Sequence, residues 1–260
     1  AVAAHALDGF DEVIVATGVS PRDPQISGQD HPKVLSYIDV LRDHRAVGAR
    51  VAIIGAGGIG FDVAEYLVHS GTSATLDLPA WQAEWGVADP ALAPGGLRPG
   101  PPQTPPSARE VTLLQRKAGK LGAGLGKTTG WIHRTTLKHR GVQMVGGVNY
   151  ETIGDQGLLV SHGERRESPT WLPCDTVVLC AGQVPLRTLA DDLLAQGRTL
   201  DTNLHVIGGA LEAGELDAKR AIQQGTELAL RLDPCDQSKT VAANADAQSA
   251  NGQNDAKNNT

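Results

Sequence analysis

The sequence predicts an α/β fold in which helices cover a mostly parallel sheet. Short apolar runs rich in β-branched residues recur along the chain, as is typical of strands buried on both faces. Residues 51–54 form the clearest of these runs, and a glycine turn and a helical apolar pattern follow it. Hydrophobic residues make up 40% of the chain but aromatic residues only 3%, so we expect an aliphatic core.

The first predicted strand covers residues 12–16 and ends in Thr17 and Gly18. A glycine at the carboxyl end of a strand lets a ligand approach the backbone, and open α/β sheets bind ligands at that edge. We therefore name Thr17 and Gly18 as candidate cofactor-binding residues, with an ordinary strand exit as the alternative. The proline-rich residues 20–32 predict an extended connector, and the pattern of residues 34–41 predicts a short helix.

The central element runs from residue 50 to residue 69 and is predicted as a strand, a glycine turn and a helix. The glycines complete G-x-G-x-x-G, whose spacing gives a tight turn, close approach of a pyrophosphate, and close packing of the helix on the strand. The free amides and the dipole at the helix start favour an anion there. The predicted dinucleotide-binding residues are Gly55, Gly57, Gly58, Ile59 and Gly60. A glycine-rich turn without a ligand is the alternative.

Residues 72–108 interrupt this pattern with many prolines and glycines and two tryptophans. The segment is too long for an ordinary loop, so we interpret it as a mobile surface loop. An insertion that takes part in the function is the alternative.

A second strand is predicted over residues 110–114 and leads into Arg116 and Lys117. A site for NAD places an acidic residue here to bind the ribose hydroxyls, whereas a site for NADP uses cations for the extra phosphate. Arg116 and Lys117 therefore favour NADPH as the cofactor. Two solvated surface cations are the alternative.

Residues 119–134 partly match a phosphate loop of the form G-x-x-x-x-G-K-[ST]. Gly126, Lys127 and Thr128 supply its end, but Leu121 occupies the position of the first glycine. A P-loop NTPase is therefore the less favoured alternative function.

The remaining patterns complete an α/β domain. Further strands are predicted at residues 142–145, 158–160, 176–180 and 204–207, and helices at 189–194 and 216–232. The strand at residues 176–180 ends in Ala181 and Gly182, which repeat the pattern of Thr17 and Gly18 and join the candidate cofactor-binding residues, and the strand at residues 204–207 stops at Gly208 and Gly209. Residues 233–260 are polar, and we expect a disordered tail there.

Charge and cysteine content restrict the function further. A net charge of −6 and a pI near 5.7 argue against partners such as nucleic acid or a membrane. The three cysteines form no C-x-x-C pair, and we find no signal peptide or membrane span, so we expect a cytoplasmic protein. His133 and His139 lie on different helix faces, so we expect no metal site. The start at Ala1 suggests part of a longer protein.

Several segments together resemble the C-terminal part of the bacterial NADPH-dependent 2,4-dienoyl-CoA reductases, iron–sulfur flavoenzymes of fatty-acid β-oxidation. The resemblance is carried by HPKVLSYIDVLRD, VAIIGAGGIGFDVAEYL, LLQRKAGKLGAGLGKTTGWIHRTTL, VVLCAGQVPLRTL, and HVIGGA followed by ELDAKRAIQQG. It covers nearly everything between residues 10 and 232.

The resemblance implies a Rossmann-like NADPH-binding domain at residues 46–182, inserted in a partial FAD-binding domain formed by residues 1–45 and 183–232. It places Thr17 and Gly18 near FAD, and Gly208 and Gly209 facing the flavin. The enzyme would pass a hydride from NADPH to FAD and then electrons through a 4Fe-4S cluster to FMN.

Two departures from the family matter. Leu211 stands where the family has an aspartate that binds FAD, which implies weak or absent FAD. The barrel domain with FMN and the 4Fe-4S cluster has no counterpart here, so it is the expected partner, and we expect this chain alone to be inactive on a dienoyl-CoA. A non-catalytic NADPH-binding module is the alternative.

Overall fold

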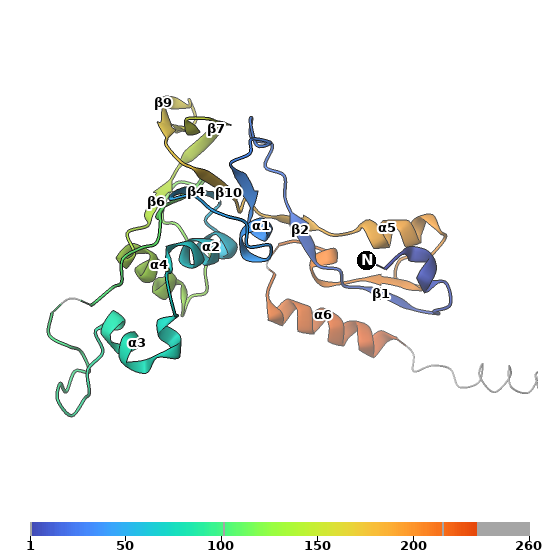
Figure 1. The fold of residues 1–260 in the computed structure, drawn as a ribbon. Coiled ribbons are helices and arrows are strands. Elements are labelled where there is room, and N and C mark those ends of the chain that lie inside the picture. The colour runs from blue at the N-terminus through green and yellow to red at the C-terminus, as the bar shows by residue number, and fades with distance from the viewer. Residues whose placement is uncertain (1, 101, 215, 233–260) are drawn as a thin grey trace, which may run out of the picture. The chain divides into compact units, whose positions relative to one another are not determined.

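The computed structural model describes residues 2–100, 102–214 and 216–232, which form two units (Figure 1). Within the described residues, unit 1 combines residues 2–20 with residues 184–232, and unit 2 is the stretch between them, residues 21–183. The tail predicted to be disordered, residues 233–260, lies outside the described residues.

Unit 2 is built on a five-stranded sheet with the strand order β3-β10-β4-β5-β6, in which every neighbouring pair is parallel. Its strands are β3 (Val34–Ser36), β10 (Thr176–Leu179), β4 (Arg50–Ile54), β5 (Glu110–Gln115) and β6 (Gln143–Gly146). The predicted strands at residues 51–54, 110–114, 142–145 and 176–180 are therefore confirmed. β4 lies at the centre, as its uninterrupted apolar sequence requires.

The two faces of this sheet are covered differently (Figure 1). Ile53 faces the helical side, where it packs with α1 (Tyr37–Leu41), α2 (Gly58–Val68) and α4 (Gly130–His139). Ile54 faces the opposite side, which is covered by an antiparallel sheet of β7 (Val148–Gly154), β8 (Gly157–His162) and β9 (Glu167–Leu172). Both isoleucines are fully buried, and each burial stabilises the fold by about 1.5–3 kcal/mol. Of these three strands, the sequence pattern predicts only the middle of β8, at residues 158–160.

Residues 34–41 do not form the single helix that we expected. Val34–Ser36 form β3 at the edge of the sheet, where Val34 is paired with Val177, and only Tyr37–Leu41 are helical. The side chain of Ser36 accepts a hydrogen bond from the amide of Asp39, and the Asp39 carboxylate accepts one from the amide of Ser36. This capping box starts the helix at Tyr37 and leaves the preceding residues extended.

The segment at residues 72–108 contains a 3-10 helix, η2 (Ala74–Leu76), and an α-helix, α3 (Leu78–Trp85), so it is not a plain loop. Asp77 caps α3 by accepting a hydrogen bond from the amide of Ala80, and none of the residues of α3 is buried. The largely buried Arg140 donates to the Glu84 carboxylate at 2.5 Å and to the Pro105 carbonyl at 3.3 Å. These contacts anchor the segment at the end of α4.

Unit 1 has a two-stranded parallel sheet of β1 (Val13–Val15) and β12 (Leu204–Val206), which confirms both predicted strands. Its helices are η1 (Ala4–Leu7), α5 (Thr188–Ala195), η3 (Gly208–Ala210) and α6 (Ala218–Arg231). Val15, Leu193 and Leu204 lie in its core. Among the described residues, no helix has the length and apolar character that crossing a membrane would require.

Unit 2 begins earlier in the chain than the predicted NADPH-binding domain, whereas the two end at nearly the same residue. The chain leaves unit 1 within β2 (Val19–Pro21) and returns to it within β11 (Gln183–Pro185). Residues 21–45, which we placed in the FAD-binding part, belong structurally to unit 2 because β3 extends its sheet beside β10. The assignment of each cofactor to a domain stays a prediction.

Candidate functional site

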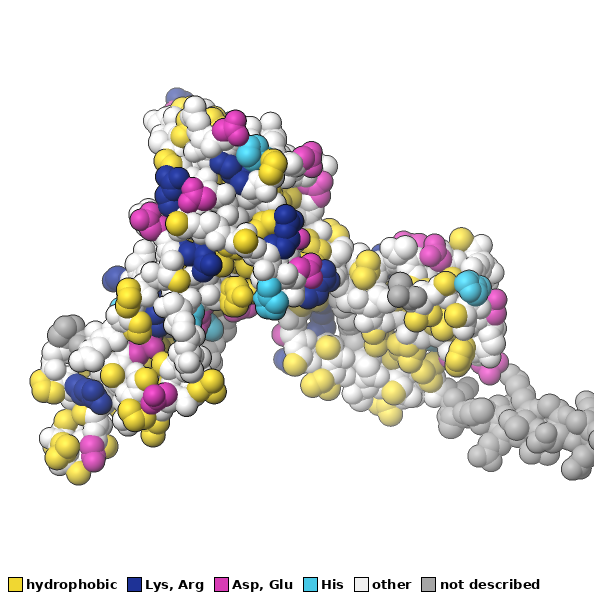
Figure 2. All heavy atoms as spheres, viewed as in Figure 1, with side chains coloured by type: hydrophobic (Ala, Val, Ile, Leu, Met, Phe, Trp, Pro, Cys, Tyr) yellow, Lys and Arg dark blue, Asp and Glu magenta, His cyan; other side chains and the backbone are white. Residues whose placement is uncertain are grey.

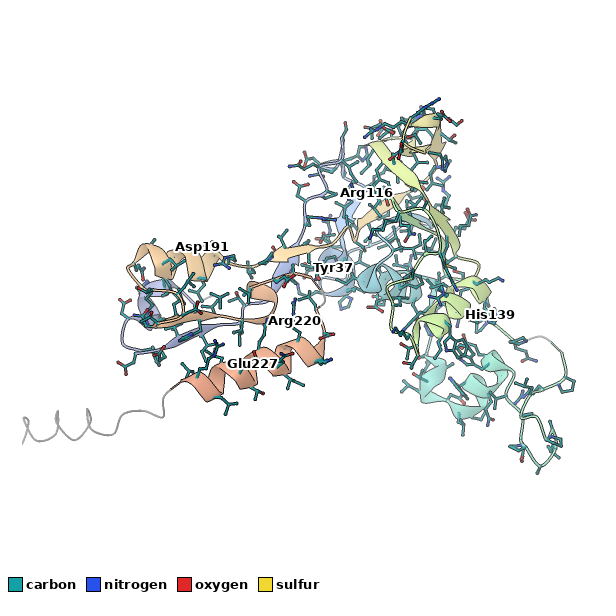
Figure 3. The ribbon with its side chains drawn as sticks, turned by 180° about the vertical axis from the view of Figure 1, so that it is seen from behind. Tyr37, Arg116, His139, Asp191, Arg220 and Glu227 are labelled. Carbon is teal, nitrogen blue, oxygen red and sulfur yellow. The ribbon has the colours of Figure 1, made fainter. Side chains whose placement is uncertain are left out.

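A cleft of about 560 Å³ lies in unit 2 at the carboxyl ends of β4, β5 and β10. It is lined by the turn between β4 and α2, by residues 115–125 after β5, and by Cys180, Ala181 and Gly182 after β10. Arg116, labelled in Figure 3, stands at the end of β5. This is the edge at which open α/β sheets bind their ligands.

Most of the predicted residues of unit 2 meet in this cleft. The lining includes Gly55, Gly57, Gly58, Arg116, Lys117, Ala181 and Gly182. Ile59 and Gly60 do not line it, because both face the core of the unit. A Cβ atom on Gly60 would lie 1.8 Å from the carbonyl oxygen of Gly55, so this glycine permits the helix to pack against the turn, as its place in the motif predicts.

The other two glycines of the motif have different roles. Gly55 has a φ of +110°, and a Cβ atom there would lie 2.2 Å from the carbonyl oxygen of Cys180. Gly57 has an ordinary φ of −82°, and a Cβ atom there would meet nothing within 4 Å. The fold therefore requires glycine at position 55, whereas glycine at position 57 leaves open space in the cleft at the start of α2. That open space beside free helix amides fits a pyrophosphate.

The cleft is strongly positive. Arg22, Arg116, Lys117 and Lys120 line it, and no aspartate or glutamate does. Within the described part of the chain, none of these four cations forms an ion pair. By contrast, Figure 2 shows acidic and basic side chains interspersed over the visible face of unit 2. The concentration of positive charge favours an anionic ligand with more than one charged group.

Several residues that line the cleft are not among the predicted ones, including two cations and a tyrosine. Lys120 lies in the glycine-rich segment that we compared with a phosphate loop. Arg22 comes from the connector after the first strand, and Tyr150 from β7. Burial raises the pKa of Tyr150, an effect that the charge of Arg116 partly offsets. Tyr150 therefore keeps its proton, and its hydroxyl group can donate a hydrogen bond.

The phosphate-loop alternative does not match the structure. A P-loop joins a strand directly to its helix, whereas turns and bends over residues 116–129 separate β5 from α4. Lys127, the residue that would bind the phosphate, does not line the cleft, although Gly122 and Gly124 do. This glycine-rich segment thus forms one wall of the same cleft as the G-x-G turn.

The cysteines of unit 2 are poor candidates for redox chemistry. Cys174 and Cys180 are both buried and free. Burial raises the pKa of the Cys180 thiol to about 12, and the negative charge of Asp62 acts in the same direction. Burial also raises the pKa of Cys174, which the charge of Lys33 partly offsets. Because the thiolate is the reactive form, neither thiol is activated.

Alkylation tests this conclusion. In a Cys235→Ser variant, we expect a maleimide at pH 7.5 to leave Cys174 and Cys180 unmodified in the native protein and to modify both after unfolding in guanidinium. Mass spectrometry of peptides reports each site. Rapid modification of Cys180 in the native protein would contradict the pKa shift and its burial.

In unit 1, the two predicted pairs of cofactor-binding residues lie next to each other at the carboxyl ends of β1 and β12. A Cβ atom on Gly209 would lie 3.1 Å from the Cα of Gly18, so glycine at position 209 allows this close approach. The Thr17 hydroxyl donates to the Leu186 carbonyl at 2.6 Å, and the Gly208 amide donates to the Gln224 side chain at 2.6 Å. The Thr17 hydroxyl and the Gly208 amide are thus both hydrogen-bonded to other groups of the protein.

Comparison with known proteins gives the family. Residues 4–225 match the sequence model of the pyridine nucleotide-disulphide oxidoreductases. The chain belongs to this family. Members of the family bind FAD and NAD(P), so this chain is an oxidoreductase domain of the flavoprotein class, and the predicted α/β fold is confirmed.

The relatives of this oxidoreductase are longer proteins. A metal reductase of Desulforamulus reducens is 27% identical over 203 residues, which are 78% of this chain and 28% of the relative. A cinnamate reductase of Clostridium sporogenes is 46% identical over 68 residues, 26% of this chain and 10% of the relative. The chain thus spans less than a third of both curated relatives.

Solved structures share the fold at low sequence identity. A 2-naphthoyl-CoA reductase superposes with a TM-score of 0.66 at 20% identity, over 90% of this chain and 29% of that protein. The thioredoxin reductase of T. acidophilum superposes with a TM-score of 0.54 at 15% identity, over 84% of this chain and 64% of that protein.

Proposed function

We propose that the cleft of unit 2 binds NADPH and that the chain is the electron-entry part of a 2,4-dienoyl-CoA reductase-like enzyme, with FAD as the hydride acceptor. One observation carries the proposal: the cleft that contains the open space at Gly57 is lined by four cations that form no ion pair among the described residues, and by no acid. NADPH carries negative charge at two separate places, its pyrophosphate and its 2′-phosphate, and thus matches this distribution of charge.

The residues of the cleft would divide between these two groups. The amides at the start of α2 would hold the pyrophosphate, because a helix N-terminus stabilises negative charge. Arg116 and Lys117, which follow β5, would bind the 2′-phosphate by charge-assisted hydrogen bonds. When bound, the nicotinamide supplies a hydride.

The described part of unit 1 fits only a portion of an FAD site. The edge formed by Gly18 and Gly209 gives a flavin close access to the backbone. The position after η3 is Leu211, which is 47% exposed and offers no hydrogen-bonding group to the ribityl chain. The neighbouring Glu212 is paired with Arg220 at 3.4 Å. FAD is therefore expected to bind weakly to this chain alone.

The substrate class is proposed from the sequence resemblance and from the names of the relatives. Cinnamate and 2-naphthoyl-CoA, which two of those proteins reduce according to their names, are both unsaturated acyl compounds. A dienoyl-CoA belongs to the same class. A barrel domain with FMN and a 4Fe-4S cluster is the proposed partner, because it would supply the site at which the substrate is reduced.

Calorimetry with the purified chain tests the cofactor. We expect NADPH to bind at least ten times more tightly than NADH, since only NADPH has the 2′-phosphate. Equal affinity for the two would contradict the selection of NADPH, and no binding of either would contradict the site itself.

The alternative is a non-catalytic NADPH-binding module. It is favoured by Leu211 and by the ion pair that Glu212 forms with Arg220. An absorption spectrum separates the two functions, because bound flavin absorbs at about 450 nm. We expect slow NADPH-dependent reduction of a dye when FAD is added, and no loss of dienoyl-CoA absorbance without the barrel domain. Saturating FAD without any dye reduction would favour the binding module.

A further inference from the structure

Arg22 is the cation of the cleft that belongs to no sequence motif, and the fold holds it at the end of β10. Its backbone amide donates to the carbonyl oxygen of Gly182 at 3.0 Å. Its guanidinium donates to the carbonyl oxygen of Ala181. The backbone and the side chain of Arg22 are thus both fixed to the turn after β10, at Gly182 and Ala181 respectively.

Gly182 leaves the space that the guanidinium of Arg22 occupies. Its φ is +104°, and a Cβ atom there would lie 3.0 Å from Nη2 and 3.2 Å from Cζ of Arg22. A larger residue would therefore push the guanidinium away. The glycine turn predicts that a cofactor approaches the backbone at Gly182, and in the structure the guanidinium of Arg22 lies beside this glycine. Through Arg22, this position presents a cation to the cleft.

Arg22 has hydrogen-bonding capacity left for a ligand. A guanidinium has five N–H donors, and the protein carbonyl of Ala181 accepts from one of its nitrogens. Arg22 forms no ion pair with an acid of the described residues. A planar guanidinium that lines a cleft with free donors suits a phosphate oxygen.

The strand order indicates which phosphate group of the cofactor Arg22 would bind. β5 and β10 flank β4 on opposite sides, so Arg116 and Arg22 stand on opposite sides of the G-x-G turn. If the 2′-phosphate is bound on the β5 side and the pyrophosphate over the turn, the nicotinamide half extends toward β10. The pyrophosphate is the nearest anionic group to that half, since a nicotinamide riboside carries no negative charge.

We propose that Arg22 is a cofactor-positioning residue, which binds the nicotinamide-side phosphate of the pyrophosphate from the β10 side of the cleft. The inference rests on the proposed NADPH site and deepens it. It assigns three of the four cations to two tasks: Arg116 and Lys117 select the phosphorylated cofactor, whereas Arg22 holds the part that NADPH and NADH share.

The test compares three ligands in calorimetry with the full chain. We expect Arg22→Gln to weaken NADPH and NADH by the same factor, about tenfold to a hundredfold, because one charge-assisted contact is lost from each. Adenosine 2′,5′-bisphosphate lacks the nicotinamide-side phosphate, so its affinity should not change. Arg22→Lys should recover part of the binding, because it keeps the charge but loses the planar fork.

Arg116→Gln is the matched comparison, since it should weaken NADPH and the bisphosphate but leave NADH unchanged. Unchanged affinity of Arg22→Gln for both dinucleotides, with wild-type binding intact, would overturn the role of Arg22 alone. A loss confined to NADPH would also overturn it and would place Arg22 with the 2′-phosphate. Failure of the wild-type chain to bind either dinucleotide would refute the proposed site and this inference together. Far-ultraviolet circular dichroism and thermal melting confirm that each variant is folded.

Discussion

Gly57→Val is expected to reduce dinucleotide binding at least a hundredfold while leaving the fold intact. The backbone at Gly57 has a φ of −82°, which valine can adopt, and a Cβ atom there meets nothing within 4 Å. The same open space is where the pyrophosphate would contact the first amides of α2. The valine side chain would fill it and displace the phosphate, and calorimetry with NADPH and NADH measures the loss.

Gly95→Val is the matched control for this variant. Gly95 also has open space around a Cβ atom, but it lies in the segment between β4 and β5 and does not line the cleft. We expect its melting temperature and NADPH affinity to equal those of the wild type. If Gly57→Val binds NADPH normally, the pyrophosphate does not lie over this turn and the site is misplaced.

The second large effect is expected from Arg116→Ala combined with Lys117→Ala. Both side chains are exposed at the mouth of the cleft, so each charge-assisted contact is taken at the lower end of its usual range, about 1.5 kcal/mol. The pair would then weaken NADPH roughly a hundredfold, and NADH by less than threefold. Because the contacts are exposed, the preference for NADPH in the wild type should shrink as salt concentration rises.

Lys127→Ala is the control for the double variant. Lys127 belongs to the same glycine-rich segment but does not line the cleft, so its loss should leave both affinities unchanged. If NADPH and NADH weaken equally in the double variant, Arg116 and Lys117 do not select between them. An effect of Lys127→Ala comparable to that of the double variant would revive the phosphate-loop interpretation.

The sequence alone determined the local parts of the site. The apolar run at residues 51–54 predicted β4, and the spacing of Gly55, Gly57 and Gly60 predicted the turn and the start of α2. Arg116 and Lys117 could be placed because they directly follow a strand that the pattern identified. In each case the signal and the structure lie within a few residues of each other, so backbone conformation and periodicity were sufficient.

The tertiary structure decided what depends on residues far apart in the sequence. Arg22 joins the cleft by contacting Ala181, 159 residues later, and no local pattern marks that pairing. Tyr150 enters it from β7, whose antiparallel sheet covers the face of the main sheet that carries Ile54. β3 was mistaken for a helix because three edge residues show no period of their own, and their extended form depends on pairing with β10. Contacts between residues far apart in the sequence therefore complete the positive cleft. The glycine motif by itself predicts only where that cleft lies.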